Sequence, residues 1–424
     1  MKTTRASAIA VWAKADRFTA RQNLLAAGVT CALLVITGCG SLRPRHPVPA
    51  AQVDQAQIPG MPGVRMLLHP LQVDLSQIDR SLTNASPRAA VRDRPLTLLA
   101  LSGGGGDGAF GAGVLCGWTA AGNRPEFDIV TGISTGALIG TYAFLGQALD
   151  AELKQNYTSI SDKEIFAKRG VFGILKARDA LTSTAPLEKL IAKEIDPARL
   201  EAIAVEYRKG RRFYVGTSDL DAGCAVVWDM GAIAASGQPG ALELFRKVLL
   251  ASASLPVAFP PVYFDVEAGG QRFEEMHADG GVMTQVFGAI FLNRLKEMTG
   301  GGDGRLYILR NAQLRPEWKA VKPKLASIAG RAVGSMIHTQ GFGDLYRLYL
   351  AAQAAKVDFN LAAIPEDFDA PRQGEFDPAF MRALFDRGYE QARAGFPWAK
   401  APPGVDVMSR VGSDSGASQT SGKR

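Results

Sequence analysis

The stretch FDIVTGISTGALIGTYAFLG, residues 127–146, predicts a strand, a sharp turn and a helix in direct succession. The same order occurs upstream, where the apolar run LTLLAL (96–101) precedes a glycine-rich turn and a small-residue helix ending at Gly122. Such an apolar run is typical of a strand buried on both faces of a parallel sheet. Two strand–turn–helix units in sequence predict an α/β fold.

Further segments extend this pattern toward the C-terminus. Residues 211–220 and 305–311 are expected to be strands. Helices are expected at 240–255, where the apolar residues recur with helical periodicity, and at 324–356 and 377–393. The sequence has no internal repeat.

Ser134 stands between Gly132 and Gly136 in the pattern G-x-S-x-G. In this motif the serine lies on a strained turn from a strand into a helix, where larger side chains two positions away would collide. The turn places the hydroxyl group at the N-terminus of the helix, where the helix dipole and free N–H groups favour developing negative charge. We therefore expect Ser134 to be a nucleophile, with a purely structural turn as the alternative.

A serine nucleophile also needs N–H donors for the oxyanion that forms when it attacks a carbonyl group. The run Gly103–Gly108 follows a predicted strand, and we expect the amides of Gly104, Gly105 and Gly106 to fill this role. A nucleotide-binding loop is the rival interpretation. A phosphate loop would need a lysine after Gly108, and there is none. Dinucleotide binding stays open on the glycine spacing alone.

The group that takes the proton of Ser134 has three candidates. His277 and His338 are the histidines downstream of the serine, but neither has neighbours typical of a catalytic loop. Asp279 begins the turn DGG (279–281) after an apolar stretch, which is a better position for a functional carboxylate. An ordinary Ser-His-Asp esterase remains the alternative.

These motifs together resemble those of the patatin-like phospholipase family. LSGGGGDG (101–108) is similar to the family's glycine-rich loop, GISTG (132–136) to its nucleophile elbow, ASASLPVAFPPV (251–262) to its central helix-to-loop segment, and DGGV (279–282) to its aspartate motif. They occur in the family's order within residues 95–285. The resemblance implies a three-layer α/β/α fold with a mostly parallel central sheet.

The resemblance also implies the chemistry. In this family a Ser–Asp dyad works without histidine, so Asp279 would act as general base and general acid for Ser134. The protein would be a serine acyl hydrolase that cleaves phospholipid, lysophospholipid or other carboxylic esters through an acyl-enzyme. No metal ion or organic cofactor is implied. The motif glycines are Gly103, Gly108, Gly132, Gly136, Gly280 and Gly281.

One position departs from the family pattern. The family usually has Arg or Lys just before the last glycine of the glycine-rich loop, whereas this chain has Asp107. A carboxylate there could repel a phospholipid phosphate, which puts the preference for phospholipids in doubt. It also keeps open a second alternative, a catalytically silent envelope lipoprotein.

The N-terminus predicts export and lipidation. A basic region up to Arg21 precedes the apolar run 24–38, which is shorter than the roughly 20 residues that span a membrane. The sequence ITGC (36–39) resembles the lipobox of bacterial lipoproteins, in which the cysteine, here Cys39, is diacylated and becomes the first mature residue. Gly40 in place of Asp favours the outer over the inner membrane. We expect a lipid-anchored protein of the bacterial cell envelope.

The expected domains follow from these segments. Residues 1–38 would be a signal peptide and 39–94 a tether, with a short ordered lead-in near VRMLLHPLQVDL (64–75). Residues 95–400 would be the catalytic domain, with its motif core at 95–285 and a helical part at 320–395, and 401–424 a disordered tail. The substrate would be a membrane lipid or another ester, and the oligomeric state is left open.

Composition excludes some other classes. The signal peptide carries a net charge of +4, which leaves only +3 of the chain's +7 and no basic stripe, so nucleic-acid binding is not expected. The four histidines are scattered and no CxxC occurs, which argues against a zinc site. Cys116 and Cys224 could form a disulfide or remain as buried thiols.

Overall fold

The structure is a computed structural model that describes residues 45–68, 94–168, 180–292, 303–316, 318 and 320–405. The predicted signal peptide, Cys39 and most of the predicted tail lie outside these residues. Among the helices that are described, none is long and apolar enough to cross a membrane.

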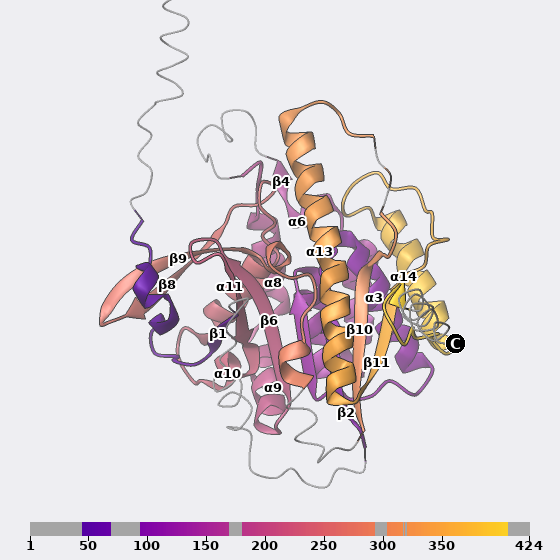
Figure 1. Cartoon of the computed structure of the whole chain (residues 1–424), viewed down its shortest axis with the longest axis horizontal. Helices are drawn as coiled ribbons and strands as arrows, with labels where there is room; N and C mark the ends of the chain where they lie inside the picture. The colour runs from indigo at the N-terminus through magenta and orange to yellow at the C-terminus, as the bar shows by residue number, and fades with distance from the viewer. Residues whose placement is uncertain are drawn as a thin grey trace, which may run out of the picture. The chain divides into compact units, whose positions relative to one another are not determined.

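A nine-stranded sheet is the centre of the fold (Figure 1). Its main path has the order β1-β7-β6-β3-β2-β10-β11, and β9 joins it by pairing with β6 and β8. The strands are β1 Arg65–Leu68, β2 Leu96–Leu101, β3 Ile129–Ile133, β6 Arg212–Asp219, β7 Cys224–Asp229, β8 Val262–Ala268, β9 Gln271–Asp279, β10 Gly304–Gln313 and β11 Val357–Ile364. A separate small hairpin pairs β4 Ala167–Lys168 with β5 Thr182–Ser183.

The five strands β6, β3, β2, β10 and β11 are parallel neighbours, and the remaining pairs are antiparallel. Parallel strands end at the same edge of a sheet, so the residues that follow β2, β3 and β10 converge there. The glycine-rich loop after Leu101 and the turn that carries Ser134, after Ile133, therefore meet at one edge of the sheet.

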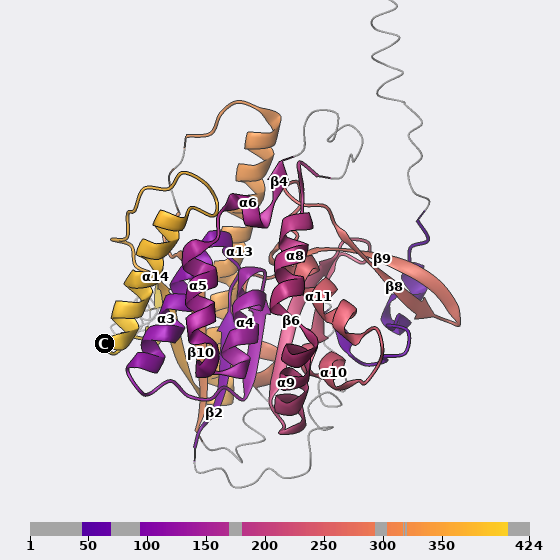
Figure 2. The ribbon, with the colours of Figure 1, turned by 180° about the vertical axis from the view of Figure 1, so that it is seen from behind.

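Helices cover both faces of the sheet. In Figure 1 the long helix α13 (Leu325–Ala355) lies in front of the sheet. Figure 2, the view from behind, shows helices on the opposite face. These are α3 Gly108–Ala120, α4 Thr135–Leu145, α5 Asp150–Ser159, α6 Asp162–Ile165, α8 Ala185–Glu194, α9 Pro197–Arg208, α10 Met230–Ala235, α11 Ala241–Ser252 and α14 Pro378–Arg393. Short 3-10 turns are η1 Ala50–Gln55, η2 Gly105–Asp107, η3 Gln147–Leu149 and η4 Gly280–Val282.

Strand β2 shows how one sequence serves two cores. Leu99 and Leu101 pack in the cluster of the α3–α4 side, while Leu98 and Ala100 pack in the cluster of the α13 side. Because side chains alternate along a strand, an unbroken apolar run supplies both faces. The expected three-layer α/β/α fold with a mostly parallel central sheet is confirmed.

The expected strands and helices that lie in the described residues are present, with bounds that shift by a few residues. Part of the segment predicted as a tether, residues 39–94, belongs to the folded domain, and it includes the start of the stretch 64–75 for which a short ordered lead-in was expected. Strand β1 pairs with β7, and Arg65 makes a buried ion pair with Glu275. The sequence indicated a short ordered segment here but not its pairing, because the partner strand β7 lies far away in the sequence.

Candidate active site

Ser134 lies at the turn between β3 and α4 with φ 54° and ψ −126°, a conformation that a non-glycine residue adopts only under strain. The two flanking glycines are required sterically. A methyl group on Gly132 would lie 2.4 Å from the carbonyl oxygen of Gly136, and one on Gly136 would lie 2.4 Å from that of Leu101. The G-x-S-x-G motif therefore forms the expected elbow, which presents the serine at the carboxyl edge of the sheet.

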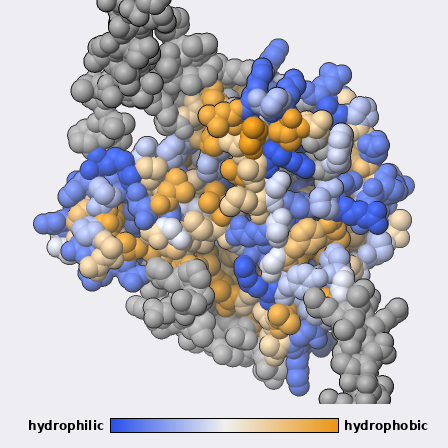
Figure 3. Space-filling model, turned by 45° about the horizontal axis from the view of Figure 1, so that its top comes forward, coloured by the Kyte–Doolittle hydropathy of each residue, from blue (hydrophilic) through white to orange (hydrophobic). Residues whose placement is uncertain are grey.

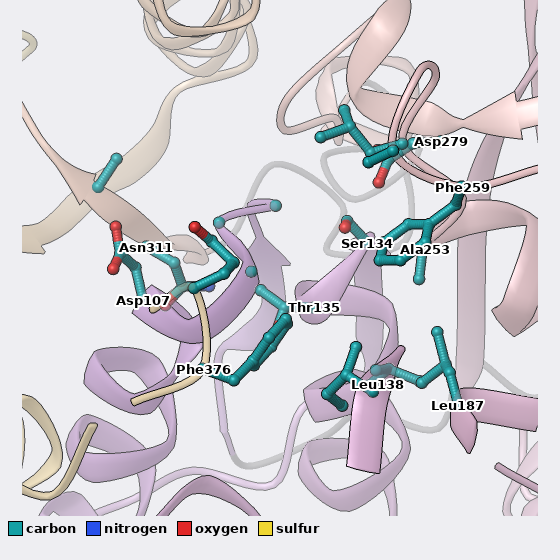
Figure 4. A pocket seen from close by; sticks show the side chains of 18 of the residues that line it. Asp107, Ser134, Thr135, Leu138, Leu187, Ala253, Phe259, Asp279, Asn311 and Phe376 are labelled. Atoms are coloured by element: carbon teal, nitrogen blue, oxygen red, sulfur yellow. The ribbon is translucent and has the colours of Figure 1, made fainter. Parts of the chain in front are cut away.

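Asp279 lies at the end of β9 and is buried. Its carboxylate accepts a hydrogen bond from the amide of Gly281 at 2.7 Å and lies beside the hydroxyl group of Ser134. Burial raises the pKa of Asp279 to about 6, and the interactions with Ser134 and with the amide of Gly281 oppose this rise. Figure 4 shows the two side chains next to each other. The fold thus brings together two residues that are far apart in the sequence.

The segment 251–262 holds both of these residues in place. The hydroxyl group of Ser252 accepts a hydrogen bond from the amide of Ser134 at 2.9 Å and donates one to the carbonyl of Gly216 at 2.7 Å. The carbonyl of Ser254 accepts a hydrogen bond from the amide of Asp279 at 2.9 Å. Sequence reasoning assigned no role to either serine, although both lie in a quoted motif.

The glycine-rich loop lies directly beside the elbow. A methyl group on Gly103 would lie 3.3 Å from Cβ of Ser134. Gly104 and Gly105 line the same cavity as the serine, whereas Gly106 is buried and does not. Within the described part of the chain, the amides of these three glycines donate no hydrogen bond. Gly104 and Gly105 therefore meet the requirement for an oxyanion hole better than Gly106 does.

Asn311, which sequence reasoning missed, fixes the start of this loop. Its amide group donates to the carbonyl of Ser102 at 2.9 Å, and its carbonyl oxygen Oδ1 accepts from the amide of Gly111 at 3.1 Å. Its backbone N–H donates to the Ser102 hydroxyl at 2.8 Å. A polar residue at the carboxyl end of the predicted strand 305–311 was the signal that could have found it.

Asp107 is paired with a cation from a distant segment. Arg372 donates to its carboxylate at 2.7 Å, and the guanidinium also lies over the ring of Phe380, 4.7 Å from its centre. Both charged side chains are about a quarter exposed. The fold therefore brings a cation to the carboxylate of Asp107, which partly compensates its negative charge beside the glycine-rich loop.

The remaining motif glycines lie at close contacts around the same edge. A methyl group on Gly108 would lie 2.4 Å from Oγ1 of Thr135, and one on Gly280 would lie 2.5 Å from the carbonyl oxygen of Gly216. On Gly281 it would lie 2.9 Å from Oδ1 of Asp279.

A cavity of about 730 Å³ opens at Ser134 and Asp279. We call one part of its lining the apolar wall; it comes from α4, α8, α11 and the segment that follows α11, and consists of Leu138, Leu187, Leu190, Ile191, Leu249 and Phe259. We call another part the cationic wall; it consists of Arg310, Arg331 and Arg372. Arg310 is buried, and burial lowers its pKa to about 10.

The two candidate histidines lie in different places. His277 is fully buried, hydrogen-bonded to Thr217 at 2.8 Å and packed against Phe264, and it does not line the cavity. His338 does line the cavity, and burial lowers its pKa. Among the described residues, neither histidine makes a hydrogen bond to Ser134.

A buried cluster of Asp219, Glu275 and His277 has ligand atoms within 4.8 Å of one another, which is close enough for a metal ion. Its groups already have protein partners. Asp219 accepts from two backbone amides, and Glu275 is paired with Arg65. We interpret the cluster as a buried polar network. Cys116 and Cys224 are buried free thiols.

Residues 99–289 match the sequence model of the patatin-like phospholipases. They form a patatin-like domain. The match begins in β2 and ends ten residues after Asp279, so it includes the glycine-rich loop, the elbow and the aspartate turn. It supports lipid acyl hydrolysis as the general class of activity of this patatin-like domain.

A crystal structure of VipD from Legionella pneumophila is similar, with a TM-score of 0.37 and 14% sequence identity over 71% of this chain. The chain spans 66% of that protein, just under two thirds of its length. No curated protein matches the sequence.

Proposed function

We propose that the protein is a serine acyl hydrolase that uses a Ser134–Asp279 dyad to cleave lipid acyl esters. The position of Ser134 beside the buried carboxylate of Asp279, in a cavity that Gly104 and Gly105 also line, is the observation that carries the proposal. Ser134 attacks the acyl carbonyl group while its proton moves to Asp279, and the amides of Gly104 and Gly105 stabilise the oxyanion. Asp279 then protonates the leaving alcohol, and water hydrolyses the acyl-Ser134 intermediate with Asp279 again acting as base.

The raised pKa of Asp279 supports its role as the base. A free aspartate is a weak base, whereas a carboxylate with a pKa of about 6 is closer to the operating pH and still ionised at neutral pH. We therefore expect kcat/KM to rise with pH through about 6 and to level off above it.

The geometry favours the dyad over the Ser-His-Asp alternative. His277 is engaged with Thr217 away from the cavity, and it is only two residues from Asp279 on the same strand. His338 lines the cavity but is not hydrogen-bonded to Ser134, so a substitution at His338 is the sharper test of this alternative.

The lining of the cavity supports a lipid as the substrate. The apolar wall offers an environment for an acyl chain, because transfer of methylene groups out of water is favourable. The cationic wall adds positive charge to the lining, and Arg310 has an Nε atom with no hydrogen-bond partner among the described residues. With Asp107 paired to Arg372, a phospholipid or lysophospholipid remains within the proposal.

We also propose that the protein is a lipoprotein of the bacterial cell envelope, anchored through Cys39. The basic and apolar leader followed by ITGC supports this. Mass spectrometry of the purified mature N-terminus tests it, since a diacylglyceryl group on Cys39 is expected.

Fluorophosphonate labelling of the full-length protein, with peptide mapping and ester turnover, tests the hydrolase. We expect a label on Ser134, no turnover in Ser134→Ala, and at least about a hundredfold loss in Asp279→Asn, the usual scale of a lost acid–base group. His338→Ala should retain turnover.

Loss of turnover in His338→Ala with a normal fold would instead favour the triad. A folded wild-type protein with neither label nor turnover would favour the silent lipoprotein.

A further inference from the structure

The two halves of helix α13 have different surroundings. In its C-terminal half, Leu345, Leu348 and Ala352 are buried against the sheet. Its N-terminal half extends beyond the sheet in Figures 1 and 2. The N-terminal half therefore owes little of its stability to packing on the core.

The N-terminal half has an exposed apolar stripe, made of Leu325, Ile328, Ala332 and Met336. The spacing of three, four and four residues places these side chains on one face of the helix. Leu325 is 86% exposed and Met336 is 71% exposed, and Trp318 just before the helix is 87% exposed. Hydrophobic residues also gather near the top of Figure 3. Contiguous exposed apolar residues of this kind mark an interaction surface.

The charge of this segment identifies the kind of partner. From Trp318 to Gln340 the sequence contains four Lys or Arg residues and no Asp or Glu. Three of the four, Lys319, Lys322 and Lys324, lie close to Trp318 in the sequence, just before the helix. An apolar helix face next to a basic segment with an aromatic residue is suited to lie at the surface of an anionic membrane.

The same half of α13 also lines the cavity. Arg331, Ser335 and His338 belong to the cavity lining, on a different face of the helix from the stripe. A membrane that contacts the stripe would therefore lie next to the cavity that contains Ser134.

We propose that Trp318 and the stripe form a docking surface for an anionic lipid bilayer, separate from any anchor at Cys39. This inference rests on the proposed lipid substrate. The apolar side chains enter the headgroup region, and the three lysines that precede the helix contact anionic headgroups. A lipid then passes from the bilayer into the cavity.

Quenching of tryptophan fluorescence by brominated lipids in phosphatidylglycerol vesicles tests the docking in the full-length protein. The difference between wild type and Trp318→Phe isolates the signal of Trp318 from any contact of the N-terminus. We expect quenching of Trp318, and a loss of about tenfold or more in vesicle affinity in the triple variant Leu325→Ser, Ile328→Ser, Met336→Ser. Leu350→Ser removes an apolar side chain that is 66% exposed in the other half of α13, and should have no effect.

The outcomes separate docking from catalysis. Ser134→Ala should dock normally, and the triple variant should hydrolyse a soluble ester at the wild-type rate. Turnover of the soluble ester without quenching of Trp318 would overturn the docking surface alone. Equal quenching with neutral phosphatidylcholine vesicles would contradict the role of charge. If the wild type is a dimer and the triple variant is a monomer, the stripe binds a second copy of the chain and not a bilayer, which would overturn the proposal.

Discussion

At the scale of single residues, the burial of Asp279 favours its proposed role as a base but lowers the stability of the folded protein. Its pKa is about 6 in the folded protein and 3.8 in its ordinary state, because burial disfavours the charged form. The folded protein binds this proton more tightly than the unfolded chain does. The buried charge therefore lowers the free energy of unfolding. The loss reaches its full value of about 3 kcal/mol above pH 6 and disappears as the pH falls below about 4.

We therefore expect Asp279→Asn, despite its loss of turnover, to be more stable than the wild type at pH 8, by up to about 3 kcal/mol. The amide oxygen can still accept from the amide of Gly281. The difference in unfolding free energy, measured with urea at several pH values, should shrink toward zero near pH 4. Asp358→Asn is a control in which the change in stability should have the opposite sign. The hydrogen bond from Lys400 lowers the pKa of Asp358, so this variant should be less stable than the wild type at pH 8. Equal stability of Asp279→Asn and wild type at pH 8 would contradict the raised pKa.

The pair Asp107–Arg372 makes a second prediction at this scale. Arg372→Gln leaves a negative charge beside the glycine-rich loop, and should lower kcat/KM for a lysophospholipid by several-fold, equivalent to about 1 kcal/mol. Asp107→Asn in the same chain should restore most of it, and a neutral ester should respond little. A double-mutant cycle with both substrates measures the coupling, and additive effects would show that the ion pair has no role in substrate choice.

At the scale of elements, helix α8 supplies a part of the site that sequence reasoning did not predict. Its side chains Leu187, Leu190 and Ile191 form much of the apolar wall, and Leu187 is 2% exposed. The elbow and the glycine loop are short motifs with local steric causes. The apolar wall has no motif, because any apolar residue of suitable size can line a cavity.

Leu187→Trp should therefore change acyl-chain selectivity. The larger ring fills space beside Leu138, so kcat/KM for a palmitoyl ester should fall about tenfold or more, as expected for overpacking of 1–3 kcal/mol, while a butyryl ester should react normally. Lys189→Trp, on the exposed face of α8, is the matched control. A parallel loss for both esters would indicate a general defect of the site.

At the scale of the whole molecule, residues before the matched domain complete the fold. Arg65 in β1 makes two hydrogen bonds to Glu275 in β9 and one to the carbonyl of Ala56. Both charged side chains are almost fully buried. Removing one partner leaves an uncompensated buried charge, which is costly.

Arg65→Met should therefore destabilise the protein by about 3–5 kcal/mol in urea unfolding, while the folded fraction keeps its activity. Arg65→Met with Glu275→Gln should recover part of this loss, because the buried charge is also removed. Arg272→Met breaks a pair on the exposed side of the same hairpin, and should change stability little. A small effect of Arg65→Met would mean that residues 50–68 are a tether after all.

The sequence by itself determined the local geometry of this protein: the alternation of strands and helices, and the identities of Ser134 and Asp279 as candidates. These features depend on neighbours in the chain, since a glycine two residues away or an unbroken apolar run constrains the backbone directly. The tertiary structure decided which distant residues meet. Asn311 contacts Ser102 across 209 residues, and Arg372 reaches Asp107 across 265. Such contacts depend on strand order and helix packing, which bring the ends of parallel strands to one edge and leave no local pattern in the sequence.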